Sequence, residues 1–113
     1  MGALTAKQLV NTELPVSTPT TVYTVPANTT TRVTEILLSN NSGAARVVNI
    51  WHVETGGTAG DDNEITGGGF SVPQGLPVPL AFNTFLEAGD FIRVDCDGAD
   101  VALIISGIEE DVS

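Results

Sequence analysis

The feature that most constrains the fold is a series of short β-like runs that begins at Thr20. Each run is rich in Val, Ile, Thr or aromatic residues and ends at Gly, Pro, Asn or Asp, which form turns. The runs cover residues 20–25, 32–39, 45–54, 70–72, 78–85, 91–96 and 101–108. About seven or eight strands at this spacing predict an all-β fold, a single antiparallel β-sandwich or jelly-roll-like domain.

Two turns are typical of hairpins, since each lies between two apolar runs. They are the segment 40–43, which reads Asn-Asn-Ser-Gly, and the pair Asp97-Gly98. In the first predicted hairpin, Ile36 and Leu38 alternate with Leu37, so both faces are apolar near the middle. Such a strand pair is expected inside a sandwich or an oligomer rather than at a wetted edge.

We expect four segments to supply most of the core. They are Val33–Leu38, Val47–Val53, Phe91–Cys96 and Val101–Ile108. Trp51 alternates with Val47 and Val53, which predicts that it is a core aromatic residue.

The first nineteen residues lack the period-2 pattern of the rest of the chain, and Pro15 limits any helix there. We therefore predict an N-terminal arm over 1–19 and a β-sandwich domain over 20–113, which should fold without the arm. The apolar side chains of the arm would each forfeit ~1.5–3 kcal/mol in water, which predicts that they contact another subunit or shell. These predicted contact residues are Leu4, Leu9, Val10 and Leu14. A frayed tail is the alternative.

Charge and composition exclude several classes of partner. The chain has 14 acidic and 4 basic residues and a formal net charge of -10, and its basic residues are scattered. This predicts no nucleic-acid binding and no adhesion to an anionic membrane. The beginning of the chain has no apolar stretch of signal-peptide length, and the single Cys permits no intramolecular disulfide. We therefore expect a soluble protein made in a cytoplasm.

The residues that usually carry chemistry are few and isolated in the sequence. His52 lies within a strand and has no Ser motif to serve, and Cys96 is best explained as a small apolar residue. Asp90 and Asp97 each flank a turn glycine, so turn formation accounts for them better than calcium binding. The Gly- and Asp-rich segment 55–69 is expected to be an exposed loop. We predict no catalytic, cofactor or metal site.

Three stretches together resemble small virion structural proteins of tailed bacteriophages. They are LTAKQLVNTELP (4–15), VYTVPANTTTRVTEILLSNNSG (22–43) and LEAGDFIRVDCDGADVALIISGIEE (86–110). The resemblance implies a non-enzymatic capsid decoration (cement) protein on the outer surface of the head, made in the host cytoplasm. It also implies a homotrimer that binds the major capsid protein. Fibre, neck and baseplate accessory roles are alternatives within the same resemblance.

A hypothesis from another class is a carbohydrate- or ligand-binding β-sandwich module. Only the fold class, Trp51 and the loop 55–69 favour it. Sedimentation of the purified protein with phage heads would separate the two hypotheses.

Overall fold

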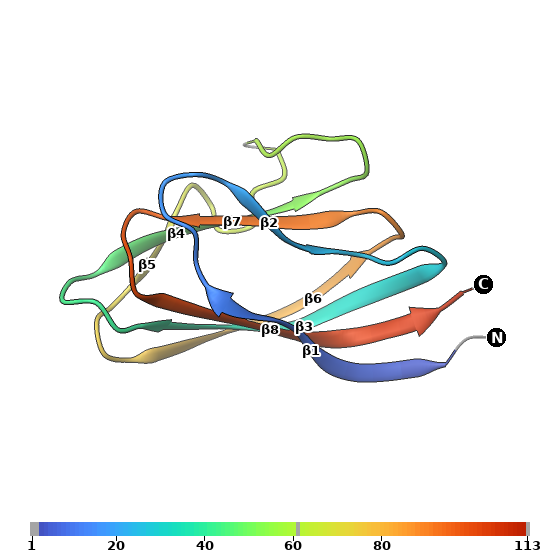
Figure 1. Cartoon of the computed structure of the whole chain (residues 1–113), viewed down its shortest axis with the longest axis horizontal. Coiled ribbons are helices and arrows are strands. Elements are labelled where there is room, and N and C mark those ends of the chain that lie inside the picture. The colour runs from blue at the N-terminus through green and yellow to red at the C-terminus, as the bar shows by residue number, and fades with distance from the viewer. Residues whose placement is uncertain (1–2, 61, 113) are drawn as a thin grey trace.

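The chain forms a two-layer β-sandwich in a computed structural model that describes residues 3–60 and 62–112 (Figure 1). Its strands are β1 (Leu4–Glu13), β2 (Thr20–Thr24), β3 (Thr29–Asn40), β4 (Arg46–Val53), β5 (Phe70–Val72), β6 (Pro77–Leu86), β7 (Phe91–Cys96) and β8 (Val101–Asp111). The described residues include no helix long and apolar enough to cross a membrane. The predicted all-β sandwich is confirmed.

The strand order is that of a jelly roll. One sheet has the order β1-β8-β3-β6 and the other β2-β7-β4-β5. The first strand pairs with the last, the second with the seventh, the third with the sixth and the fourth with the fifth, all antiparallel. This pairing pattern arises when the first half of the chain runs antiparallel to the second half and the two fold together around a common core. It places most consecutive strands in opposite sheets.

The core lies between the sheets, because alternate residues of each strand point inward. The inward residues of β3, β4, β7 and β8 are buried, as their sequences predict. They include Val33, Ile36, Leu38, Val48, Ile50, Ile92, Val94, Cys96, Val101, Leu103 and Ile105. Trp51 differs from the prediction, because it lies half-buried opposite Arg93 on the outer face. Val48 and Ile50 point inward, so Trp51 and Val53 have the outward parity, and Val53 is buried there beside Gly57 of the loop 55–69.

The two predicted hairpins are wrong, although both turns exist. The turn after β3 leads to β4 in the opposite sheet, and Asp97-Gly98 likewise connects β7 to β8 across the sandwich. The buried side chain of Asn40 explains the first crossing. Its Nδ2 donates to the carbonyl oxygen of Val72 at 3.0 Å, and its Oδ1 accepts from the backbone N–H of Ser42 at 2.9 Å. Asn40 therefore fixes a corner between the sheets rather than a hairpin.

The prediction of an N-terminal arm outside the sheet is also wrong. Residues 4–13 form β1, an edge strand that pairs with β8 along its length, and the register shifts between Gln8 and Val10. This irregularity moves the side-chain alternation by one residue, which hides the strand from a period-2 search. Leu14 follows, and its N–H donates to the carbonyl oxygen of Val101 at 2.8 Å. Residues 1 and 2 of the predicted arm lie outside the described residues.

Candidate interaction surface

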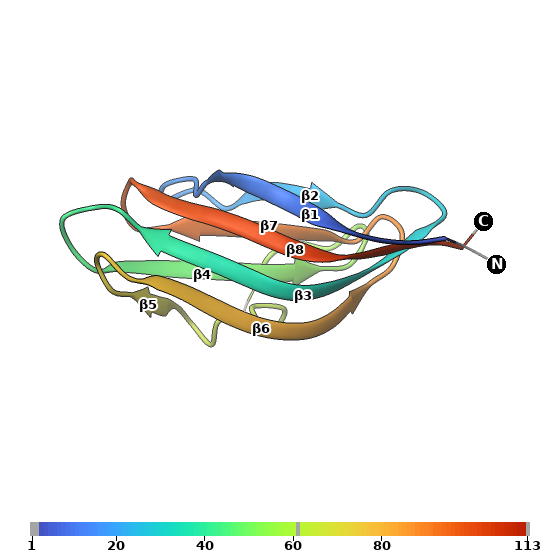
Figure 2. The ribbon, with the colours of Figure 1, turned by 90° about the horizontal axis from the view of Figure 1, so that it is seen from below.

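The outer face of the β1-β8-β3-β6 sheet is unusually apolar, and Figure 2 shows its four strands side by side. In one row across this face, Ile104 of β8 lies opposite Leu37 of β3, which lies opposite Pro79 of β6. In another row, Arg32 lies between Ile108 and Phe85. We call this surface the apolar face and define it by the outward residues Leu4, Leu37, Pro79, Ala81, Phe85, Ala102, Ile104 and Ile108.

The central strands β3 and β8 carry apolar side chains on both sides, yet the second sheet covers only one of them. Leu103 and Ile105 are fully buried in the core, whereas Ile104 between them points outward and is partly exposed. At the end of the face, Leu4 and Phe85 are 69 % and 64 % exposed. Strands with two apolar faces normally have both faces covered, and contiguous exposed apolar patches mark interaction sites.

Four charged residues of the described part of the chain occupy outward positions of this sheet. Glu110 lies opposite Leu4 and Glu13 opposite Ala102. Arg32 and Glu35 occupy neighbouring outward positions of β3, opposite Ile108 and Ser106 of β8. Neither has a hydrogen-bond or ion-pair partner among the described residues. Arg32 also lines a pocket of about 160 Å³ with Leu4, Phe85, Ile108 and Glu110. Strand β3 therefore offers one unpaired positive and one unpaired negative charge on this face.

The outer face of the other sheet is different, because its polar groups have partners within the chain. Nδ2 of Asn49 donates to Oδ1 of Asp95 at 2.8 Å, and Nε of Arg93 donates to Oγ1 of Thr21 at 3.1 Å. The loop 55–69 joins this sheet through a bridge from Glu64 to Trp51 of β4. The apolar residues of this face, Val47, Trp51 and Phe91, thus lie among polar groups that are paired within the chain.

A polar cluster ties the two sheets together near the ends of β2 and β8. The Tyr23 hydroxyl donates to Oε2 of Glu109 at 2.5 Å and lies 2.8 Å from the Thr31 hydroxyl, while Nζ of Lys7 lies 3.2 Å from Oε1 of Glu109. Burial, and then the bond to Glu109, raises the pKa of Tyr23 well above its ordinary value. The same bond from Tyr23, with a contribution from Lys7, lowers the pKa of Glu109. These groups form a structural clamp.

The surroundings of His52 differ from the expected isolation, because its Nε2 lies 3.9 Å from Oδ2 of Asp90. The Asp90 carboxylate already accepts hydrogen bonds from the N–H of Glu87 at 2.9 Å and of Thr55 at 3.1 Å. The Thr55 hydroxyl contacts Asp90 at 3.3 Å, whereas a nucleophile would have to contact the histidine that activates it. Asp90 thus anchors a turn and the start of a loop, which agrees with its predicted turn role.

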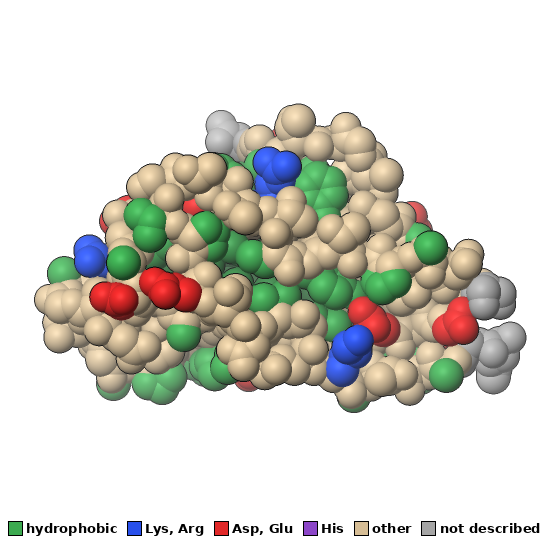
Figure 3. All heavy atoms as spheres, in the orientation of Figure 1, with side chains coloured by type: hydrophobic (Ala, Val, Ile, Leu, Met, Phe, Trp, Pro, Cys, Tyr) green, Lys and Arg blue, Asp and Glu red, His purple; other side chains and the backbone are tan. Residues whose placement is uncertain are grey.

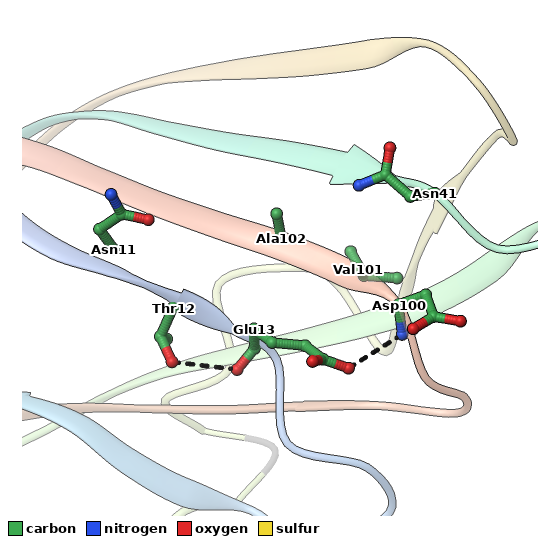
Figure 4. A pocket seen from close by; sticks show the side chains of 7 residues that line it. All are labelled: Asn11, Thr12, Glu13, Asn41, Asp100, Val101 and Ala102. Atoms are coloured by element: carbon green, nitrogen blue, oxygen red, sulfur yellow. Dashed lines mark hydrogen bonds between the residues drawn. The ribbon is translucent and has the colours of Figure 1, made fainter.

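Other concave surfaces of the part of the chain that the structure describes are open to solvent. One pocket, of about 510 Å³, lies where β1 ends and β8 begins. Figure 4 shows its lining residues, among which Oε2 of Glu13 accepts from the N–H of Asp100 at 3.1 Å. Another, of about 570 Å³, lies inside the loop 55–69 beside His52. Across 3–60 and 62–112, the side chains of His, Cys, Asp and Glu form no group of three or more that could hold a metal.

The four predicted contact residues separate into three environments. Val10 and Leu14 are 7 % and 2 % exposed and belong to the core of their own chain. Leu9 lines a groove of about 480 Å³ between the edge strands β1 and β2, where Figure 3 shows apolar side chains in a hollow. Leu4 is on the apolar face. Contact with another subunit therefore stays a prediction for Leu4 and Leu9, while burial in the core accounts for the other two.

Comparison with known proteins gives a likeness of fold. No protein-family model and no curated protein matches the chain. A solved structure from work entitled "Bacillus endospore appendages form a novel family of disulfide-linked pili" matches with a TM-score of 0.57 and 14 % sequence identity. The match covers 100 % of this chain and 92 % of the other. The chain therefore shares the overall β-sandwich architecture of that pilus protein.

Proposed function

We propose that this chain is a non-enzymatic structural protein that works in an assembly with other protein subunits. The observation that carries the proposal is the apolar face, where Leu37 and Ile104 on the two central strands point away from the core. Covering such a face with a second protein surface removes its apolar area from water, which favours association.

The finer form of the proposal is a capsid decoration (cement) protein of a tailed bacteriophage. It rests on the resemblance of the three sequence stretches. The same resemblance implies two kinds of partner, the major capsid protein and further copies of this chain in a homotrimer. The solved neighbour is described as a pilus, itself an assembled structure, and this agrees with the general form of the proposal. A jelly-roll sandwich suits this role because it is a compact body whose outer faces remain free for contacts.

The buried Cys96 favours non-covalent assembly of this chain, whereas the solved neighbour is described as disulfide-linked. Cys96 is a free cysteine, 1 % exposed, and packs in the core between the sheets. A disulfide to another subunit would require its sulfur to leave the core. We therefore expect packing and polar contacts to hold the subunits together.

The proposal is tested by comparing Ile104→Ser on the apolar face with Val47→Ser on the opposite outer face. Both residues are partly exposed β-branched side chains, so the substitutions remove similar apolar groups. We expect Ile104→Ser to weaken both the concentration-dependent increase in mass and sedimentation with heads of the phage that encodes the chain. Val47→Ser should leave both unchanged. A chain that stays monomeric and fails to sediment with heads would contradict the proposal.

A further inference from the structure

We propose that the apolar face binds the same face of a second copy of this chain, around a two-fold axis that places Arg32 of each copy against Glu35 of the other. The inference rests on the general form of the proposed function, an assembly of subunits, and it replaces the homotrimer that the resemblance implies by a two-fold pair. A two-fold contact is isologous, so a single face must be complementary to itself.

The size of the face suits a second sheet of the same dimensions. Four strands about 4.8 Å apart and ten residues long, at about 3.3 Å per residue, give roughly 600 Å². Two such faces would bury roughly 1,200 Å² in total, which is the lower limit for a specific and stable protein interface. Sheets stack face to face at about 10 Å, with side chains filling the space between them. Leu37, Ile104 and Ile108 are placed to fill it.

The charges near the middle of the face match under this symmetry. Arg32 and Glu35 both point outward from β3, at successive outward positions separated by the irregularity between Val33 and Glu35. A two-fold axis in the plane of the contact, perpendicular to β3 and passing between them, reverses the direction of the strand. Each guanidinium then faces the other copy's carboxylate, and two ion pairs form. The charges of Arg32 and Glu35 cancel within the contact, although each chain has a net charge of -10, and Glu110 beside Arg32 leaves the face acidic at that end.

Edge pairing between copies is less well supported than stacking of faces. The edge strand β6 contains Pro77 and Pro79, which cannot donate ladder hydrogen bonds. The edge strand β1 has an irregular register, and its Lys7 is held by Glu109. The other sheet ends in β2 and β5, which have 5 and 3 residues. Prolines, bulges, charges and short strands are the devices that prevent edge-to-edge association.

The test is a charge swap on the intact chain, measured by sedimentation equilibrium. Arg32→Glu and Glu35→Arg each place like charges at both sites, and we expect each to raise the dimer dissociation constant at least about tenfold. The double variant restores opposite charges and should return the constant to within about threefold of the original chain. Glu54→Arg is the control for net charge, because Glu54 is exposed and lies outside the apolar face. It should leave the constant unchanged.

The outcomes separate this inference from the proposed function. The inference is overturned if the chain is a monomer at about 100 μM, or if the double variant associates no better than the single ones. It is also overturned if the chain forms a trimer and neither charge reversal changes the formation of that trimer. If a monomeric chain still sediments with phage heads and Arg32→Glu abolishes this, the face binds the capsid instead and the proposed function stands. If neither copies nor heads bind, both proposals fail.

Discussion

Replacing Leu14 by Ala should destabilise the fold strongly, whereas the same change at Leu4 should not. Leu14 is 2 % exposed, and Leu4 is 69 % exposed. The backbone around Leu14 is fixed on both sheets: its N–H donates to Val101, and the next carbonyl, that of Pro15, accepts from Cys96 at 3.0 Å. Because the site cannot collapse easily, we expect a loss within the ~2–5 kcal/mol range for buried Leu→Ala, at about 3 kcal/mol. This is a fifth or more of the ~5–15 kcal/mol available to a domain.

Urea unfolding followed by circular dichroism measures the difference. With a slope of ~1–3 kcal/mol per molar urea, Leu14→Ala should lower the midpoint by roughly 1.5 M, while Leu4→Ala should shift it by less than about 0.3 M. Both changes are made in the Arg32→Glu background, so that loss of a contact between copies at Leu4 does not contribute. Equal midpoints for the two variants would refute the integration of this segment into the core. A chain that lacks all residues before Thr20 and still folds would also refute this integration.

Three other variants test the two faces of the sheet and the Tyr23–Glu109 clamp, and a thiol reagent tests the burial of Cys96. Ile105→Ala should lower the free energy of unfolding by ~2–5 kcal/mol, and Ile104→Ala by less than half as much, in chemical denaturation. Because the folded-state pKa of Glu109 is lowered, its contribution is present above the unfolded pKa and is lost as pH falls below about 4. Tyr23→Phe should therefore reduce the fall in melting temperature between pH 5 and pH 3. Burial raises the pKa of the Cys96 thiol, so a thiol reagent should modify native protein roughly a hundredfold more slowly than protein unfolded in urea.

The positions of the strands followed from sequence because β-branched runs and turn residues are local signals. Strands β3, β4, β7 and β8 lie within a few residues of the predicted runs, and their inward residues form the core. The pairing of strands could not be obtained in the same way. A turn such as 40–43 shows that the chain reverses, but the side-chain bonds of Asn40 to Val72, 32 residues further on, decide which sheet receives the next strand. Such long-range contacts leave no mark at the turn itself.

The strand β1 was missed for a different physical reason. Its apolar residues Leu9 and Val10 are adjacent, and the register shift between Gln8 and Val10 lets both turn toward the sandwich. A search that assumes strict alternation rejects such a segment. The run of β-compatible residues before Pro15 was a usable signal, had one irregularity been allowed.

The difference between the two outer faces is the observation on which the proposed function rests. Sequence alone showed that Ile36 and Leu37 place apolar groups on both sides of one strand, but not which side the second sheet would cover. The fold covers the side of Ile36 and leaves that of Leu37 open, next to Ile104. On the opposite sheet, by contrast, Asn49 and Asp95 satisfy each other. A chain selected only to be a soluble monomer has no reason to keep its apolar outer residues on the two central strands of one sheet. Their concentration there is therefore better explained by a partner surface that covers them.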